Sequence, residues 1–103
     1  MKAFVTSIGE TTTDLCVWSL ERQGFDVELI YNETSTLAEK LEVIYQRADD
    51  DFIRVDADVI VSRNIKELFL PKDVWWVQAK CFGWYSQDII NGGVQLKKKK
   101  ALP

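Results

Sequence analysis

The chain has 103 residues, of which 47% are hydrophobic and 28% are charged, so it predicts one globular domain and excludes a disordered protein. The net charge of −3 argues against a nucleic-acid partner, and the absence of histidine argues against a zinc site. No apolar stretch is long enough for a membrane span or a signal peptide. We therefore expect a cytoplasmic protein in which Cys16 and Cys81 are reduced core thiols.

Three apolar runs in the first half of the chain predict β-strands. They cover residues 3–6, 27–31 and 52–55, and polar or glycine residues bound each of them. The third run leads directly into Asp56. We expect these three strands to be parallel, with the first strand lying between the other two.

Helices are predicted in the two intervals between these strands. Thr11 or Thr12 can cap the first helix, and Gly24 is well placed to end it. The second helix begins after Thr36, which has the spacing of a capping box with Glu39. Its predicted buried stripe consists of Leu37, Leu41, Ile44, Tyr45 and Ala48.

The second half of the chain predicts a short helix over residues 64–70 and a fourth strand over residues 74–79. Gly92 and Gly93 are expected to introduce a fifth strand that runs to Leu96. Alternating strands and helices indicate a Rossmann-like α/β fold, an open and mostly parallel sheet with flanking helices. The open edge of such a sheet could favour a homo-oligomer.

Asp56 and Asp58 are the strongest candidates for a functional site. They follow a predicted apolar strand, and ligands of open α/β sheets bind beyond the carboxyl ends of the strands. Two close carboxylates repel each other unless a cation or a proton joins them, and Mg²⁺ and Mn²⁺ prefer oxygen ligands. By contrast, residues 49–51 precede the same strand, so we interpret them as a solvated turn at the opposite edge. An Asp-x-Asp alone is a weak motif, because many surface loops contain one.

Two longer segments resemble the signatures of a known enzyme family. Residues 56–69, DADVIVSRNIKELF, resemble the metal-binding DXD segment of GT-A-fold glycosyltransferases, most closely the glycogenin and lipopolysaccharide galactosyltransferase kind. Residues 90–96, INGGVQL, resemble the second signature of that family, an Asn-x-Gly-Val that enters a strand. The resemblance covers about residues 37–97 well, and both segments occur in the family's order.

The resemblance implies a nucleotide-diphosphate sugar as donor, with a UDP sugar favoured, and Mn²⁺ or Mg²⁺ as cofactor. It implies that Asp58 binds the metal, that Asp56 contacts the metal or the ribose, and that Asn91 and Gly92 face the sugar. The remaining implied nucleotide-binding residues follow the first two strands and are Thr6, Ser7, Gly9 and Asn32.

The chain also departs from the family. One strand–helix unit before the acidic motif is missing, the later histidine ligand is absent, and the sequence stops where the acceptor half would begin. We therefore expect residues 1–103 to be one nucleotide-sugar-binding domain that is incomplete at its C-terminus, with no catalytic residue assigned. The main alternative is a non-catalytic module that binds nucleotide and metal or a partner protein. A phosphatase of the haloacid dehalogenase type is a third reading, disfavoured because Ile60 stands where that family has threonine.

Other polar and aromatic residues have simpler structural interpretations. Lys40 and Arg54 could approach phosphates, but each is more often a surface or sheet-face charge. The basic run at residues 97–100 is expected to be a solvated chain end. Tryptophans of predicted strands are more often core residues than sugar platforms, and here they are Trp75, Trp76 and Trp84.

Overall fold

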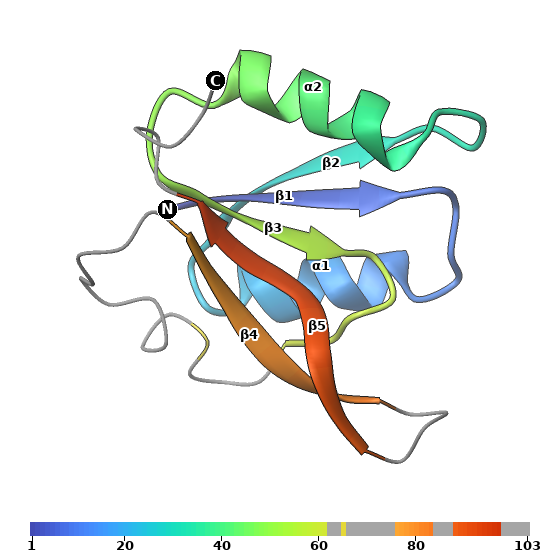
Figure 1. Cartoon of the computed structure of the whole chain (residues 1–103), viewed down its shortest axis with the longest axis vertical. Helices are drawn as coiled ribbons and strands as arrows, with labels where there is room; N and C mark the ends of the chain where they lie inside the picture. The colour runs from blue at the N-terminus through green and yellow to red at the C-terminus, as the bar shows by residue number, and fades with distance from the viewer. Residues whose placement is uncertain (62–64, 66–75, 84–87, 98–103) are drawn as a thin grey trace.

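A computed structural model of the chain shows a five-stranded sheet whose strand order is β2-β1-β3-β5-β4 (Figure 1). The structure describes residues 1–61, 65, 76–83 and 88–97, and for the last two ranges it gives the path of the backbone. Two longer helices, α1 (Thr13–Glu21) and α2 (Leu37–Arg47), connect the first three strands. None of the helices in the described ranges is both long and apolar enough to span a bilayer.

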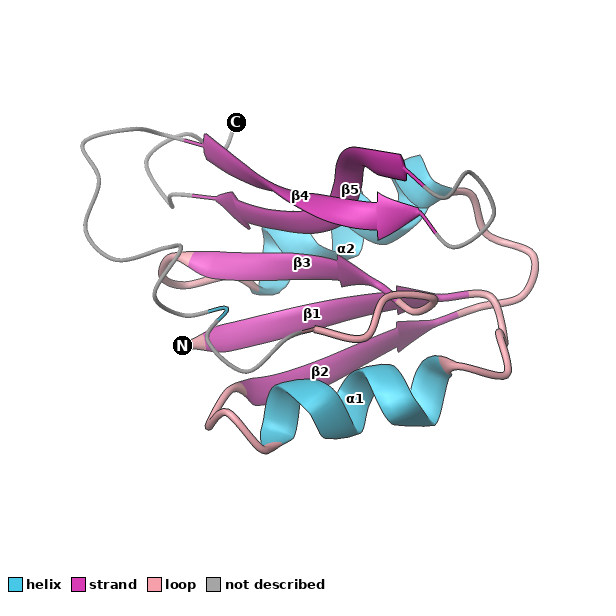
Figure 2. Ribbon diagram, turned by 90° about the horizontal axis from the view of Figure 1, so that it is seen from below, coloured by secondary structure: helices cyan, strands magenta, loops and turns pink. Residues whose placement is uncertain are grey.

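The first three strands are parallel, as predicted. β1 (Lys2–Ser7) pairs with β2 (Asp26–Tyr31) on one side and with β3 (Phe52–Asp56) on the other. Because β1 is central, the connection from β1 to β2 and the connection from β2 to β3 run in opposite directions across the sheet. Crossovers of the same right-handed sense then place the two helices on opposite faces, and Figure 2 shows this arrangement.

Each helix covers one face of the sheet because side chains alternate along a strand. α1 packs on the face that carries Ala3, Val5, Ile53 and Val55, and its own Cys16 and Leu20 are fully buried there. The other face carries Phe4 and Phe52, whose rings meet edge to face at a centroid distance of 5.3 Å. Ile44 of α2 and Ile30 of β2 complete this second cluster. The core therefore lies on both sides of the three parallel strands.

The predicted N-terminal cap is confirmed for α2 but not for α1. Thr36 and Glu39 form the capping box of α2, in which the Thr36 hydroxyl accepts a hydrogen bond from the Glu39 N–H at 3.1 Å. Thr12 precedes α1, but its side chain does not cap the helix and bonds to the strand-end segment described below. Gly24 lies in the turn after α1 with a φ of 84°, a conformation that favours glycine.

The predicted stripe of α2 needs one correction. Leu37 is 50% exposed, whereas Lys40 is only 3% exposed. The helix is therefore rotated so that a lysine, placed four residues before Ile44, points toward the sheet.

The last two strands form an antiparallel extension of the sheet. β5 (Asp88–Lys97) pairs antiparallel with β3 and with β4 (Trp76–Gly83), so four of the five strands point the same way. Gly92 and Gly93 lie inside β5 and do not precede it, which corrects the prediction. The pairing shifts register between Gln78 and Lys80 of β4, opposite this glycine pair, as at a β-bulge. Of the helix predicted over residues 64–70, only Ile65 is described, and it is helical.

Candidate functional site

The Asp-x-Asp motif lies where β3 ends. Asp56 is the last residue of β3, and the buried Ala57 belongs to the cluster beneath α1. Since alternate residues point to opposite faces, Asp56 lies on the α2 face, together with Phe52 and Arg54 of the same strand. A turn closed by a 3.0 Å hydrogen bond from the Val59 N–H to the Asp56 carbonyl then leaves Asp58 exposed.

The backbone of the motif is held from two elements. The Ala57 N–H donates to the Thr6 carbonyl of β1 at 3.1 Å, which extends the parallel pairing past the strand end. The Thr12 hydroxyl, just before α1, donates to the Ala57 carbonyl at 2.8 Å. The thiol of Cys16, a residue of α1, donates to the Asp56 carbonyl at 3.6 Å. These contacts fix the backbone of residues 56 and 57 relative to the sheet.

Arg54 is the immediate neighbour of the Asp56 carboxylate. Its Nη1 donates to Asp56 Oδ1 at 2.5 Å and to Thr6 Oγ1 at 3.3 Å, and the Thr6 hydroxyl lies 3.4 Å from the same Oδ1. The Arg54 side chain is 7% exposed, whereas that of Asp56 is 40% exposed. Arg54 is therefore a buried cation, and its ion-pair partner Asp56 is partly exposed to solvent.

The loop after β1 is organised by Ser7 and Glu10. The Glu10 carboxylate accepts hydrogen bonds from the Ile8 N–H at 2.6 Å and from the Ser7 hydroxyl at 3.2 Å. Burial alone would raise the pKa of Glu10, but these hydrogen bonds outweigh it, so the pKa lies below its ordinary value of 4.5. Gly9 has a φ of 99°, and a Cβ at this position would lie 3.4 Å from the Tyr31 ring. The loop thus requires glycine at position 9.

A hollow of about 210 Å³ lies between this loop, the end of β3 and the start of α2. Asp56, Asp58 and Glu10 supply three carboxylates to its lining. Lys40 supplies a cation, and its Nζ donates to the Ser35 carbonyl at 2.8 Å. The other lining residues are Thr6, Ser7, Ile8, Ser35 and Leu37. The hollow therefore brings together opposite charges at the carboxyl end of the parallel sheet.

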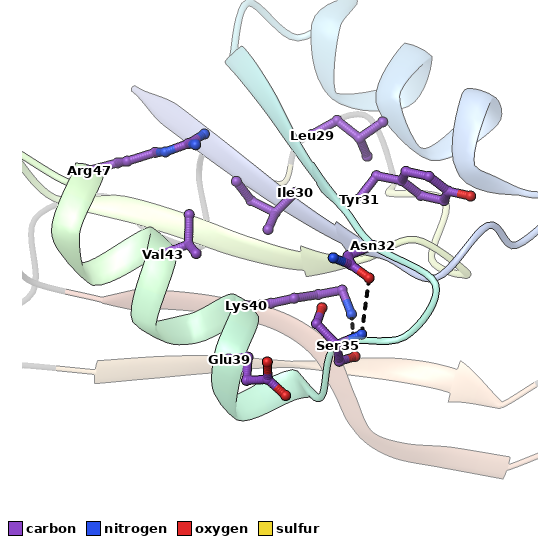
Figure 3. A pocket seen from close by; sticks show the side chains of 9 residues that line it. All are labelled: Leu29, Ile30, Tyr31, Asn32, Ser35, Glu39, Lys40, Val43 and Arg47. Atoms are coloured by element: carbon purple, nitrogen blue, oxygen red, sulfur yellow. Dashed lines mark hydrogen bonds between the residues drawn. The ribbon is translucent and has the colours of Figure 1, made fainter.

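A second hollow, of about 310 Å³, lies beside the first, between β2 and α2 (Figure 3). Lys40 and Ser35 line both hollows. Asn32 lies in the second one, where its Oδ1 accepts hydrogen bonds from the N–H groups of Thr34 and Ser35 at 2.9 and 3.1 Å. Its amide nitrogen is left facing the hollow, as Figure 3 shows.

Four of the predicted site residues share the first hollow: Thr6, Ser7, Asp56 and Asp58. Ser7 is only 1% exposed and its hydroxyl accepts a bond from the Gly9 N–H at 3.0 Å, so its side chain shapes the loop. The backbone at Asn91 and Gly92 lies at the same edge of the sheet, because β5 runs antiparallel to β3 and Val94 pairs with Val55. The side chains of these β5 residues lie outside the described part.

The charged neighbours of the two aspartates are not evident from the sequence motifs. Glu10 lies outside both signature segments and lines the hollow, and Lys40, expected to be a surface or sheet-face charge, is buried and lines it too. A sequence signal for Lys40 exists, because it lies four residues before Ile44 in the stripe that faces the sheet. Arg54 is a sheet-face charge, as expected. Its two-residue offset from Asp56 on a strand is a signal for an ion pair on one face.

The carboxylates around the hollow also affect Cys16, a core residue of α1. Burial, together with the nearby carboxylates of Asp58, Asp56 and Glu10, raises the pKa of Cys16 to about 12. This thiol is therefore neutral at physiological pH, and with 0% of its surface exposed it packs as a core residue.

The residues present fit a divalent ion only as a partial site. Asp58 makes no hydrogen bond or ion pair with other described residues, so its carboxylate is available. Within the described ranges, no three acidic or cysteine side chains come close enough to hold a metal between them. A divalent ion at Asp58 and Asp56 would therefore need further oxygen ligands from a bound molecule.

The sequence matches no protein-family model and no curated protein. Among solved structures, the fold is similar to that of a hypothetical transferase from Thermus thermophilus, with a TM-score of 0.70 and 10% identity over 96% of this chain. It is also similar to A197 from STIV, with a TM-score of 0.67 and 13% identity over 98% of this chain. The chain spans about 65% of the length of each of these proteins. At such low identity, the similarity establishes the shared fold alone.

Proposed function

We propose that this chain is the donor-binding part of a metal-dependent glycosyltransferase that uses a nucleotide-diphosphate sugar. The observation that carries the proposal is the hollow at the carboxyl end of β1 and β3, where Asp56 and Asp58 meet Lys40. Ligands of open α/β sheets bind at such a position. The resemblance of residues 56–69 and 90–96 to the two GT-A signatures supports the choice of substrate.

In this proposal the residues around the hollow divide into three groups. Asp58 holds Mn²⁺ or Mg²⁺ together with the diphosphate oxygens, and Asp56 contacts the metal or the ribose. Thr6, Ser7, Gly9 and Asn32 shape the nucleoside site, a UDP nucleoside in the first place. Asn91 and Gly92 face the donor sugar, since β5 brings their backbone to the same edge.

The chemistry needs a group that accepts the charge of the leaving diphosphate. A divalent ion supplies this as a Lewis acid when it is bound. The protein residues would orient the ion through Asp58 and bind the nucleotide. Lys40 adds a buried positive charge beside the hollow, where electrostatic interactions are stronger than in bulk water.

The test is binding of UDP-glucose, UDP-galactose and UDP by calorimetry, with Mn²⁺ or with a chelator. We expect tighter binding with Mn²⁺, and we expect Asp58→Asn to abolish that difference. Asp49→Asn is the matched control, since residue 49 precedes β3 at the opposite edge of the sheet. Equal metal-dependent binding by the wild type and Asp58→Asn would refute the assignment of Asp58.

Turnover separates the enzyme from the main alternative, a non-catalytic nucleotide-binding or protein-interaction module. The alternative is favoured by the incomplete set of metal ligands among the described residues. Released UDP is measured with each donor, Mn²⁺ and added sugar acceptors. Acceptor-dependent release supports a transferase, and metal-dependent binding without release supports the module.

A further inference from the structure

We infer that Arg54 is a positioning residue that prevents Asp56 from serving as a full metal ligand and leaves the metal to Asp58. This inference rests on the proposed function, because it divides the work of the two aspartates in that site. It is drawn from the contacts of Arg54, a residue that neither signature segment contains.

The charge of Arg54 is buried. The side chain is 7% exposed, and Asp56 is its one carboxylate partner in the described part of the chain. Its Nε has no hydrogen-bond partner there, although the atom is buried. A buried pair of this kind contributes little stability compared with an apolar residue of similar size. The arginine is therefore better explained by what it does to Asp56 than by stability.

One oxygen of the Asp56 carboxylate is occupied by hydrogen bonds. Its Oδ1 accepts hydrogen bonds from Arg54 Nη1 at 2.5 Å and from the Thr6 hydroxyl at 3.4 Å. Oδ2 makes no such bond with the described residues, and the side chain lines the hollow. Asp56 therefore offers a single oxygen, and the guanidinium compensates its charge. A divalent ion gains less from such a carboxylate than from Asp58, which has no cationic partner in the same ranges.

The ion pair between Arg54 and Asp56 also determines the order in which metal and nucleotide bind. With Asp56 engaged by Arg54, the ion has one strong protein ligand and depends on diphosphate oxygens for the rest. Mn²⁺ alone should then bind weakly, and the nucleotide should bring the ion with it. Removal of the Arg54 charge should free Asp56 as a second ligand, so that Mn²⁺ binds more tightly without nucleotide.

The test is a titration with Mn²⁺ in the absence of nucleotide, in which the EPR signal of the free ion measures how much Mn²⁺ remains unbound. Arg54→Met should bind Mn²⁺ about tenfold more tightly than the wild type. This is the order of magnitude expected when one positive charge is removed from the neighbourhood of a divalent ion in water. The nucleotide diphosphate, measured at saturating Mn²⁺, should bind more weakly, because Asp56 is no longer held in place. If the substitution only disordered the site, the affinities for Mn²⁺ and for the nucleotide would both fall.

Three variants control this result. Arg47→Met also removes an arginine, but one that pairs with Glu28, and it should leave Mn²⁺ affinity unchanged. Adding Asp56→Asn to Arg54→Met should return the affinity to near the wild-type value. Arg54→Gln keeps a hydrogen-bond donor without the charge, and it carries the same expectation should the methionine variant fail to fold.

Equal or weaker Mn²⁺ binding in folded Arg54→Met or Arg54→Gln overturns the inference, and so does an absence of detectable binding in every variant. Tighter Mn²⁺ binding in these variants, with no nucleotide binding by the wild type, refutes the proposed function and upholds the effect of Arg54 on Asp56. The two failures are thus distinguishable.

Discussion

Replacement of Asp56 by alanine should destabilise the protein because it leaves Arg54 buried without a counter-ion. Breaking a fully buried ion pair costs roughly 3–5 kcal/mol, and an exposed pair contributes at most about 1 kcal/mol. Arg54 is 7% exposed and Asp56 is 40% exposed, so this pair lies between the two cases. We expect a loss of about 2 kcal/mol in the free energy of unfolding, or a fall in Tm of about 8–16 °C for a domain of this size.

The assay is urea unfolding at pH 7, followed by far-UV circular dichroism. Asp58→Ala is the matched control, since this exposed residue has no ion-pair partner in the described ranges, and it should change stability by less than about 0.5 kcal/mol. Arg54→Met in the Asp56→Ala background should recover most of the loss, because the uncompensated charge is gone. If Asp56→Ala and Asp58→Ala unfold at the same urea concentration, the buried-charge reasoning is wrong.

Three further predictions address the core, the thiol and the loop after β1. Phe52→Ala should lower the free energy of unfolding by about 3–5 kcal/mol in the same urea assay, because it removes a fully buried ring packed on Phe4; a loss under 1 kcal/mol would contradict this packing. Cys16, with a pKa of about 12, should resist iodoacetamide at pH 8 until the chain is unfolded, and rapid labelling of the folded protein would contradict its burial. Glu10 has a lowered pKa in the folded state, so its stabilising contribution is present above about pH 4.5 and is lost as the pH falls below that value. Glu10→Gln should therefore flatten the acid side of the stability profile, measured as Tm from pH 3 to 7, and an unchanged acid slope would speak against the Ser7–Glu10 arrangement.

The early part of the fold could be predicted from sequence because its signals are local. An apolar run of residues 52–55, a capping box at Thr36 and Glu39, and strand–helix alternation each depend on neighbours in the chain. Together with the handedness of crossovers, they predict three parallel strands with β1 in the centre, which the structure confirms. The position of Asp56 at the carboxyl end of β3 follows from the same local pattern.

The antiparallel end of the sheet depended on contacts between distant segments. Nothing local distinguishes a glycine pair before a strand from one inside it, and the pairing of β5 with both β3 and β4 places Gly92 and Gly93 within the strand. A local apolar pattern does not specify which distant strand becomes the neighbour.

The charge arrangement of the candidate site was decided by tertiary structure in the same way. Sequence alone identified Asp56 and Asp58 as acidic residues at a strand end. The rotation of α2 buries Lys40, and the α2 side of the sheet encloses Arg54, so that these two cations lie beside the carboxylates. Whether a lysine or an arginine is solvated or buried depends on which surface covers it. That surface comes from residues up to 50 positions away, as the hydrogen bond between Thr6 and Asp56 illustrates.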